Sequence, residues 1–236
     1  MKKIFSVIAV IFMAAINVCA QPDQGNFYLT SKIGATYGKF TKDFCFGDNN
    51  NYYSYYYGYG SNFPNTFKSK PKVDLCTEFD LQYQYKPNFG VTMGLGLQSQ
   101  TNTIIAKDFS CYYGKFTDNV KLNLVHLIIP ITANVYIFKG LALNVGLQPQ
   151  FLIRNIWTSS FDYADDQKAE SEDIEGSIDN LQKFTMSLPV GASYEYNNII
   201  VDFRYTIGLS NISGAANNSE IRNNVLLLTV GYKCKL

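Results

Sequence analysis

Apolar and polar residues alternate with a period of two along several stretches of the chain. The clearest stretch is Ile199–Ser210, where every odd position is Ile, Val, Phe, Tyr or Leu, and where Asp202 and Arg204 are among the even positions. The same alternation occurs in Val73–Tyr85, Phe89–Gln98 and Leu141–Ile153. A period of two is that of a β-strand, so each stretch predicts a strand with one apolar face and one polar face.

Four further segments show a weaker form of this pattern and raise the number of predicted strands to eight. They are Phe27–Tyr37, Leu122–Ile137, Phe184–Tyr196 and Val225–Cys234. The second of them is almost continuously hydrophobic, which leaves its register open. Pro130 within it indicates a bulge or a locally unpaired amide, because proline has no N–H to donate to a sheet.

The predicted connections alternate between long and short from one end of the chain to the other. The short ones are Lys86–Asn88, Phe138–Gly140 and Asn197–Asn198, and the long, polar ones are 38–72, 101–119, 154–183 and 213–222. Alternate connections of an up-and-down barrel emerge at the same end. Long loops at one end and short turns at the other are typical of transmembrane barrels.

These hairpins can be tested by whether the apolar residues of each strand have odd or even numbers, here called the parity of the strand. Residues opposite each other across a hairpin share a face, so a three-residue connection must join strands of equal parity and a two-residue connection strands of opposite parity. The strands around Lys86–Asn88 and around Phe138–Gly140 are apolar at odd positions on both sides. Across Asn197–Asn198 the apolar set moves from even to odd positions. All three hairpins are consistent.

The composition of the polar face indicates that it points inward. It is rich in Gly, Ser, Thr, Asn and Gln, which suit a narrow packed interior, and Tyr or Phe residues stand near the strand ends, as in interfacial girdles. We therefore predict an all-β fold, an eight-stranded antiparallel up-and-down transmembrane β-barrel with long external loops and short periplasmic turns. The alternative is a soluble or periplasmic lipocalin-like barrel whose apolar face binds a small apolar ligand.

The N-terminus has the pattern of an export signal. Lys2 and Lys3 precede the uncharged apolar stretch 4–16, and Val18–Ala20 fits a cleavage site before Gln21. We therefore expect a signal peptide at 1–20, a single barrel domain at 21–236, and a location in the outer membrane of a double-membraned bacterium. No uncharged apolar run approaches the roughly 20 residues of a transmembrane helix.

Charge and composition limit the kinds of molecule that the protein is expected to bind. Removal of Lys2 and Lys3 leaves 18 basic and 19 acidic residues, so no overall positive field attracts nucleic acid. The chain has 18 Tyr and 17 Phe residues but a single Trp, which favours strands and interfacial positions. We expect a monomer whose partner is outer-membrane lipid, with no nucleic acid and no cofactor.

Two segments also carry a resemblance to a known family. Ile199–Ile212 followed by Asn223–Lys233 is similar to the closing hairpin of PorT-like outer-membrane β-barrel domains, in which the last strand ends in Gly-Tyr, a basic residue and an aromatic residue. The pair Ile129–Pro130 resembles that family too. The ending Cys234-Lys235-Leu236 departs from its usual terminal Phe. The resemblance implies an outer-membrane location and no defined activity.

Six charged residues fall on the predicted inner face, namely Lys32, Glu78, Asp80, Glu195, Asp202 and Arg204. An eight-stranded barrel has an interior just wide enough for side chains, so we predict a packed network of ion pairs instead of a channel. Buried charges are costly unless they are paired, so Arg204 is expected to pair with Asp202 or with a neighbouring carboxylate.

The cysteines and the histidine are candidates for other chemistry. Cys45 and Cys111 fall in predicted loops at the same end of the barrel and could form a disulfide, the alternative being two free thiols. Cys76 lies on the predicted inner face and Cys234 at the opposite end. The only histidine, His126, is surrounded by Leu and Val, and no Gly-x-Ser-x-Gly element is present. We therefore expect no metal site and no catalysis, with a lipid-modifying barrel enzyme as the alternative.

The first long loop contains the most distinctive segment of the chain. Its tyrosines are Tyr52, Tyr53, Tyr55, Tyr56, Tyr57 and Tyr59, interspersed with Ser, Gly and Asn. This composition gives large contact areas at low entropic cost, as in antibody binding loops. We predict a structural or adhesive role in which the external loops bind an extracellular protein or glycan, the alternative being that the tyrosines cap the barrel. The acidic loop 162–179 lacks the spacing of an EF-hand.

Overall fold

A computed structural model describes residues 22–41, 68–111, 114–163, 174–177, 181–213 and 220–236. Its strands are β1 Phe27–Phe40, β2 Lys68–Pro71, β3 Val73–Lys86, β4 Phe89–Cys111, β5 Gly114–Ile128, β6 Ile131–Phe138, β7 Leu141–Tyr163, β8 Ile174–Gly176, β9 Phe184–Tyr196, β10 Ile199–Gly208 and β11 Asn223–Lys235. No helix in the described part of the chain is long and apolar enough to cross a membrane.

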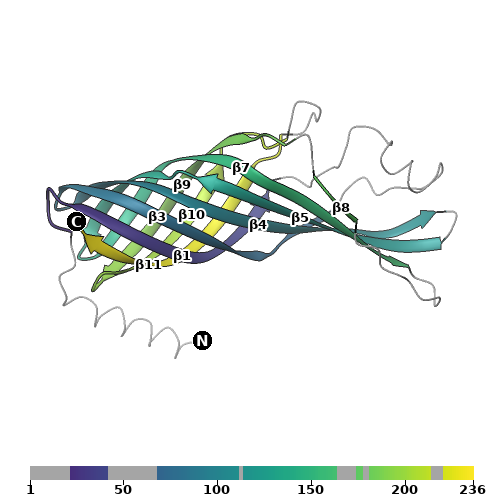
Figure 1. Ribbon diagram of the computed structural model, residues 1–236, viewed down its shortest axis with the longest axis horizontal. Coiled ribbons are helices and arrows are strands. Elements are labelled where there is room, and N and C mark those ends of the chain that lie inside the picture. The colour runs from purple at the N-terminus through teal and green to yellow at the C-terminus, as the bar shows by residue number, and fades with distance from the viewer. Residues whose placement is uncertain (1–21, 42–67, 112–113, 164–173, 178–180, 214–219) are drawn as a thin grey trace.

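The strands close into a ring of eight, as the pattern predicts (Figure 1). Each strand pairs antiparallel with its neighbour in the order β1, β3, β4, β5 with β6, β7, β9, β10 and β11, and β11 returns to β1 from Tyr28↔Lys235 to Phe40↔Asn223. β5 and β6 share one place in the ring, and the break between them falls at Ile129–Pro130. Pro130, where the sequence predicts a bulge or an unpaired amide, thus lies in a break between two strands.

The apolar face of the wall points away from the barrel axis. Val201 and Phe203 of β10 are 40% and 51% exposed, whereas Asp202 and Arg204 between them are 1% and 4% exposed. The same alternation of exposed and buried positions runs along β1 and β3. A soluble barrel that holds an apolar ligand inside would have the opposite orientation, so the lipocalin-like alternative is wrong.

The short connections lie at one end of the barrel, here called the short-turn end. Asn197 and Asn198 have φ values of 46° and 69°, which are left-handed conformations that asparagine tolerates and that a two-residue hairpin turn requires. The ladder beyond this turn pairs Val201 with Tyr194, as the parity predicted. The other two hairpins have bulges after Gln84 and Tyr136. Because of these bulges, the apolar residues fall on odd positions in both strands of each hairpin.

Strands extend far into two of the segments predicted as long loops. β4 and β5 continue as a paired hairpin to Cys111↔Gly114, and β7 continues beside β5 to Phe116↔Tyr163. The outward apolar series of β4 ends at Leu97, so this strand runs on for 14 residues, or roughly 45 Å of chain. We call this part, 98–111 with 114–124 and 154–163, the external sheet. It projects beyond the barrel at the end opposite the short turns (Figure 1).

The interior is not uniformly polar. At the base of the external sheet, where it joins the barrel, apolar side chains turn inward, among them Leu122 and Leu124 of β5 and Val225 and Leu227 of β11, all at most 2% exposed. Cys76 of β3 packs against the last two. The charged residues lie closer to the short-turn end. The other half of the lumen mixes apolar side chains with buried uncharged amides, among them Gln98, Gln100 and Asn102.

Candidate functional site

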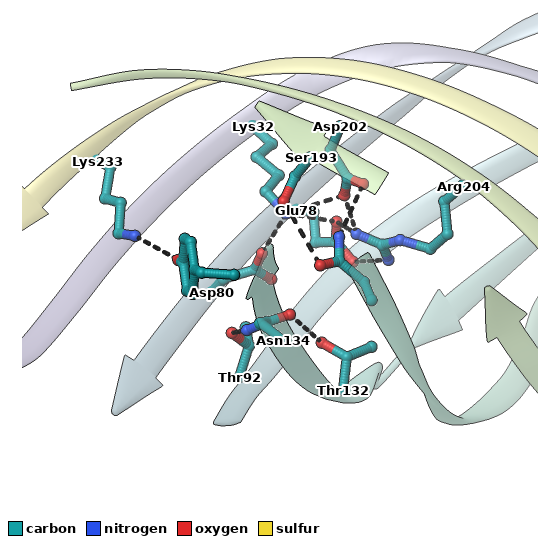
Figure 2. A network of polar contacts seen from close by, with 12 residues as sticks. Lys32, Glu78, Asp80, Thr92, Thr132, Asn134, Ser193, Asp202, Arg204 and Lys233 are labelled. Atoms are coloured by element: carbon teal, nitrogen blue, oxygen red, sulfur yellow. Dashed lines mark hydrogen bonds and ion pairs between the residues drawn. The ribbon is translucent and has the colours of Figure 1, made fainter. Parts of the chain in front are cut away.

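Five charged side chains from three strands meet in the barrel interior (Figure 2). Lys32 of β1 lies with its Nζ 2.6 Å from Asp80 Oδ2, 3.1 Å from Asp202 Oδ2 and 3.8 Å from Glu78 Oε2. Arg204 of β10 donates from Nη1 to Glu78 Oε1 at 2.9 Å and from Nη2 to Glu78 Oε2 at 3.1 Å, and it also pairs with Asp202. We call these five residues the lumen cluster.

The alternation of each strand brings this cluster together. Glu78 and Asp80 are two residues apart on β3, and so are Asp202 and Arg204 on β10, so each pair shares the inward face. Gly94 of the adjacent strand makes room for one of them, because a Cβ atom there would lie 2.3 Å from Asp80 Oδ1. The cluster thus depends on a glycine as well as on charges.

The electrostatic balance of the cluster is uneven. All five side chains are at most 8% exposed, and three carboxylates face two cations. Charges removed from water lose hydration free energy unless they are paired and hydrogen-bonded. The bidentate Arg204–Glu78 contact has the geometry that offsets this loss best. The two cations are therefore the members whose loss would leave the most uncompensated charge.

Glu195 lies apart from these five and has a different partner. Its Oε2 is 2.7 Å from the Nζ of Lys233 on β11. The ammonium group of Lys233 also lies 4.8 Å from the ring centre of Tyr28 and 5.9 Å from that of Tyr136. These residues form a second polar layer nearer the short-turn end.

A cavity of about 20 Å³, measured as the space open to the centre of a water molecule, lies between these layers. Asp80, Thr92, Asn134, Asn144 and Ser193 are among its lining residues. A volume of this size holds about one water molecule, and polar walls favour hydration. Neither a sugar nor a fatty acid would fit.

Sequence reasoning predicted that amides and hydroxyls face inward, but it did not identify the ones that complete the network. Asn134 Nδ2 donates to Thr92 Oγ1 at 2.6 Å, and Gln82 Nε2 donates to the Tyr136 hydroxyl at 2.9 Å. Lys233 was missed as well. Its inward position follows from the alternation of β11, in which Val225, Leu227, Thr229 and Lys233 share the buried parity.

The other candidate residues are placed as follows. Cys45 and the tyrosines of 52–59 lie outside the described residues, so the disulfide and the loop surface stay predictions. Cys111 ends β4 and does not stand in a loop, because the hairpin continues to that point. Cys76 is buried and Cys234 is exposed, both as free thiols. His126 is 4% exposed and faces the lumen opposite Gln98, away from the lipid-facing surface.

Within the described residues, no group of His, Cys, Asp and Glu side chains has the arrangement of a metal site. The carboxylates of the lumen cluster already accept from Lys32 and Arg204. The chemistry available to this cluster is therefore ion pairing within the protein.

Solved outer-membrane proteins resemble this chain in outline. Ail, the attachment invasion locus protein of Yersinia pestis, has 12% identity and a TM-score of 0.43 over 90% of this chain and 100% of its own. OprG of Pseudomonas aeruginosa has 12% identity and a TM-score of 0.39 over 92% and 99%. The outer membrane protease OmpT of Escherichia coli has 13% identity and a TM-score of 0.38 over 93% and 99%. These likenesses are too distant to inform function.

The sequence itself matches a family. No curated protein matches the chain. A family model described as the outer membrane protein β-barrel domain matches residues 19–214, most of the chain. The closed ring, the outward apolar face and the asymmetry of the two ends are those of a barrel set in lipid. The chain therefore belongs to the outer membrane protein β-barrel domain family, and its location is the outer membrane.

Proposed function

We propose that this protein is a non-catalytic barrel that presents an adhesive surface outside the cell. The observation that carries the proposal is the external sheet, in which β4, β5 and β7 stay paired well beyond the apolar wall. Strands that only cross a membrane need about 9–11 residues, whereas β4 and β7 each have 23. The additional length serves a purpose outside the lipid.

The interior supports a role that does not involve transport. The lumen cluster and the Lys233–Glu195 layer occupy the half of the lumen nearer the short turns, and inward leucines and buried amides occupy the other half. His126 lies between these inward leucines, where a lipid substrate would have to enter the lumen to reach it. Recognition at the external end is thus favoured over chemistry or passage inside.

The ligand class that we propose is an extracellular protein or glycan. The tyrosines of 52–59, with their Ser, Gly and Asn neighbours, suit both, because tyrosine combines a flat apolar ring with a hydroxyl. The loop that contains them connects β1 to β2, and β2 pairs with β4 of the external sheet from Lys68↔Ile105 to Pro71↔Asn102. The segment with the tyrosines is therefore followed in the chain by a strand that pairs with the external sheet.

Binding of cells that display the protein to immobilised matrix glycoproteins and to a glycan array tests this proposal. We expect wild-type cells to bind at least one ligand, and a variant with all six tyrosines of 52–59 changed to Ser to lose most of that binding. Asn49→Ser, Asn50→Ser and Asn51→Ser in the same loop form the matched control and should retain it. Binding that is equal in the tyrosine variant, or no binding by wild-type cells, would overturn the proposal.

Two narrower assignments are also proposals. The closing hairpin 199–233 supports membership of the PorT-like group. The pattern of the first twenty residues supports removal of a signal peptide, and mass spectrometry of the protein from outer membranes should then give an N-terminus at Gln21. An unprocessed N-terminus would contradict the cleavage.

A further inference from the structure

Exposed basic side chains gather at the external end of the barrel wall. They include Lys39 of β1, Lys70 of β2, Lys72 before β3, and Lys121 of β5. We call these four lysines the external basic arc. They come from neighbouring strands, because β1 pairs with β3, and β2 and β5 flank β4 on its two sides.

The register places part of this arc in a single row. Lys70 and Lys121 are both opposite Thr103, from the two sides of β4, so they flank that residue on the outer face. Strands lie about 4.8 Å apart, so the two lysine Cα atoms are separated by roughly 10 Å. Lysine side chains are long enough for both ammonium groups to contact one anion that lies between them.

The arc stands directly above the lipid-facing wall. Lys39 follows Tyr37 on the same face of β1, and Tyr37 is 46% exposed. Lys70 and Lys72 precede Val73, which is 70% exposed, by three residues or fewer, or at most about 10 Å of strand. The headgroup layer on each side of a bilayer has a thickness of the order of 5–8 Å. The ammonium groups can therefore reach the depth at which headgroup phosphates lie.

The four lysines form no ion pair with any residue that the structure describes. The carboxylate of Asp74, two residues after Lys72 in the chain, already accepts from the backbone N–H and the hydroxyl of Thr101. Glu220 pairs with Arg222 at 3.4 Å. Among the side chains that the structure describes, the arc thus has no acidic partner.

The short-turn end provides a contrast. Its exposed lysines are fewer, and Lys235 there is 2.7 Å from Asp23. The closely spaced exposed lysines of the wall thus lie on the side of the external leaflet. In an outer membrane, the lipid of the external leaflet is a glycolipid that carries phosphate groups, and lysines bind phosphate as point charges.

We propose that the external basic arc binds the phosphate groups of the glycolipid in the external leaflet, with Lys70 and Lys121 at its centre. Such binding would fix the height and rotation of the barrel in the membrane. It would also place the external sheet just above the sugar-bearing surface. This inference does not depend on the adhesive role.

Titration of the full-length protein in detergent micelles with diphosphoryl lipid A, followed by native mass spectrometry, tests the proposal. We expect Lys70→Gln/Lys121→Gln to weaken binding by roughly 10- to 30-fold, since each basic residue near a charged surface contributes about a factor of five. Lys70→Arg/Lys121→Arg should retain binding, because the charges remain. Lipid A without its phosphates should bind to the wild type as weakly as intact lipid A binds to the Gln variant.

The matched control is Lys86→Gln/Lys139→Gln, which removes two exposed lysines from the short-turn end. It should leave the affinity within about twofold, because those residues face the other leaflet. Heat-modifiable gel mobility shows whether each variant has folded. Equal weakening by the control pair, equal binding of dephosphorylated lipid A, or equal binding of phosphatidylglycerol would overturn the proposal.

Discussion

Arg204 contacts both carboxylate oxygens of Glu78, at 2.9 and 3.1 Å, although 126 residues separate the two in the chain. They belong to β10 and β3, which are not neighbours in the ring, so this contact spans the lumen. A bidentate pair fixes direction as well as distance. It therefore connects two strands that are separated by β1 and β11 along the shorter way round the ring.

Replacement of Arg204 should destabilise the barrel strongly. Arg204→Met leaves Lys32 as the only cation among three buried carboxylates, and the loss of one partner of a buried pair costs about 3–5 kcal/mol. Glu78→Gln should cost less, because it removes a carboxylate from a cluster that has one in excess. Urea unfolding of the protein in vesicles, followed by gel mobility, measures both.

A double variant separates lost pairing from lost packing. Arg204→Met combined with Glu78→Leu removes both partners and should recover at least 1 kcal/mol relative to Arg204→Met alone, because the orphaned carboxylate is gone. Additive losses would mean that the two side chains do not interact in the folded barrel.

Gly146 is expected to be intolerant of any side chain. A Cβ atom there would lie 1.9 Å from the Ile131 carbonyl oxygen and 2.7 Å from Thr132 Cα, both in the backbone of the adjacent strand. Gly146→Ala should therefore lower the free energy of unfolding by about 1–3 kcal/mol or more. Gly90→Ala is the matched control, because its closest contacts are the ends of the flexible Gln84 and Gln82 side chains. Equal effects in urea unfolding would contradict the close strand approach at Gly146.

The barrel should not conduct ions in large steps. Paired charges fill one half of the lumen, and the cavity beside them has room for about one water molecule. Planar bilayers that contain the purified protein should show no stable openings. Reproducible large conductance steps would show that the interior rearranges in the membrane.

The outward direction of β10 can be measured with a single tryptophan. The chain has one natural tryptophan, Trp157, and Trp157→Phe removes it. Among the described side chains of β7, the last exposed large apolar one is Ile153, four positions before Trp157. Phe203→Trp in that background should be quenched strongly by lipids brominated deep in their acyl chains, because Phe203 is 51% exposed in the middle of the apolar wall. Trp157 in the wild-type protein should be quenched less. Weak quenching at position 203 would mean that this side chain does not face lipid.

The sequence determined the orientation of each strand. A period of two leaves only two arrangements for a strand. The small residues between Phe89 and Leu97, and the amides and hydroxyls on the polar faces of the other strands, disfavour the arrangement in which the apolar face is inside. The parity across Asn197–Asn198 then set the register of that hairpin, and the pairing of Val201 with Tyr194 confirms it. These features are local, so the sequence can specify them without knowledge of the distant strands.

Only the tertiary structure decided which inward residues lie at the same level along the barrel axis and where the strands end. Glu78 meets Arg204, and Glu195 meets Lys233, because the stagger at which the ring closes sets the axial position of each strand, and no local pattern encodes that stagger. Beyond the lipid, the segments after Leu97 and Ile153 need no apolar face, so their alternation fades although their ladders continue. These segments remain strands because they pair with neighbouring strands, and this pairing cannot be read from the local sequence pattern.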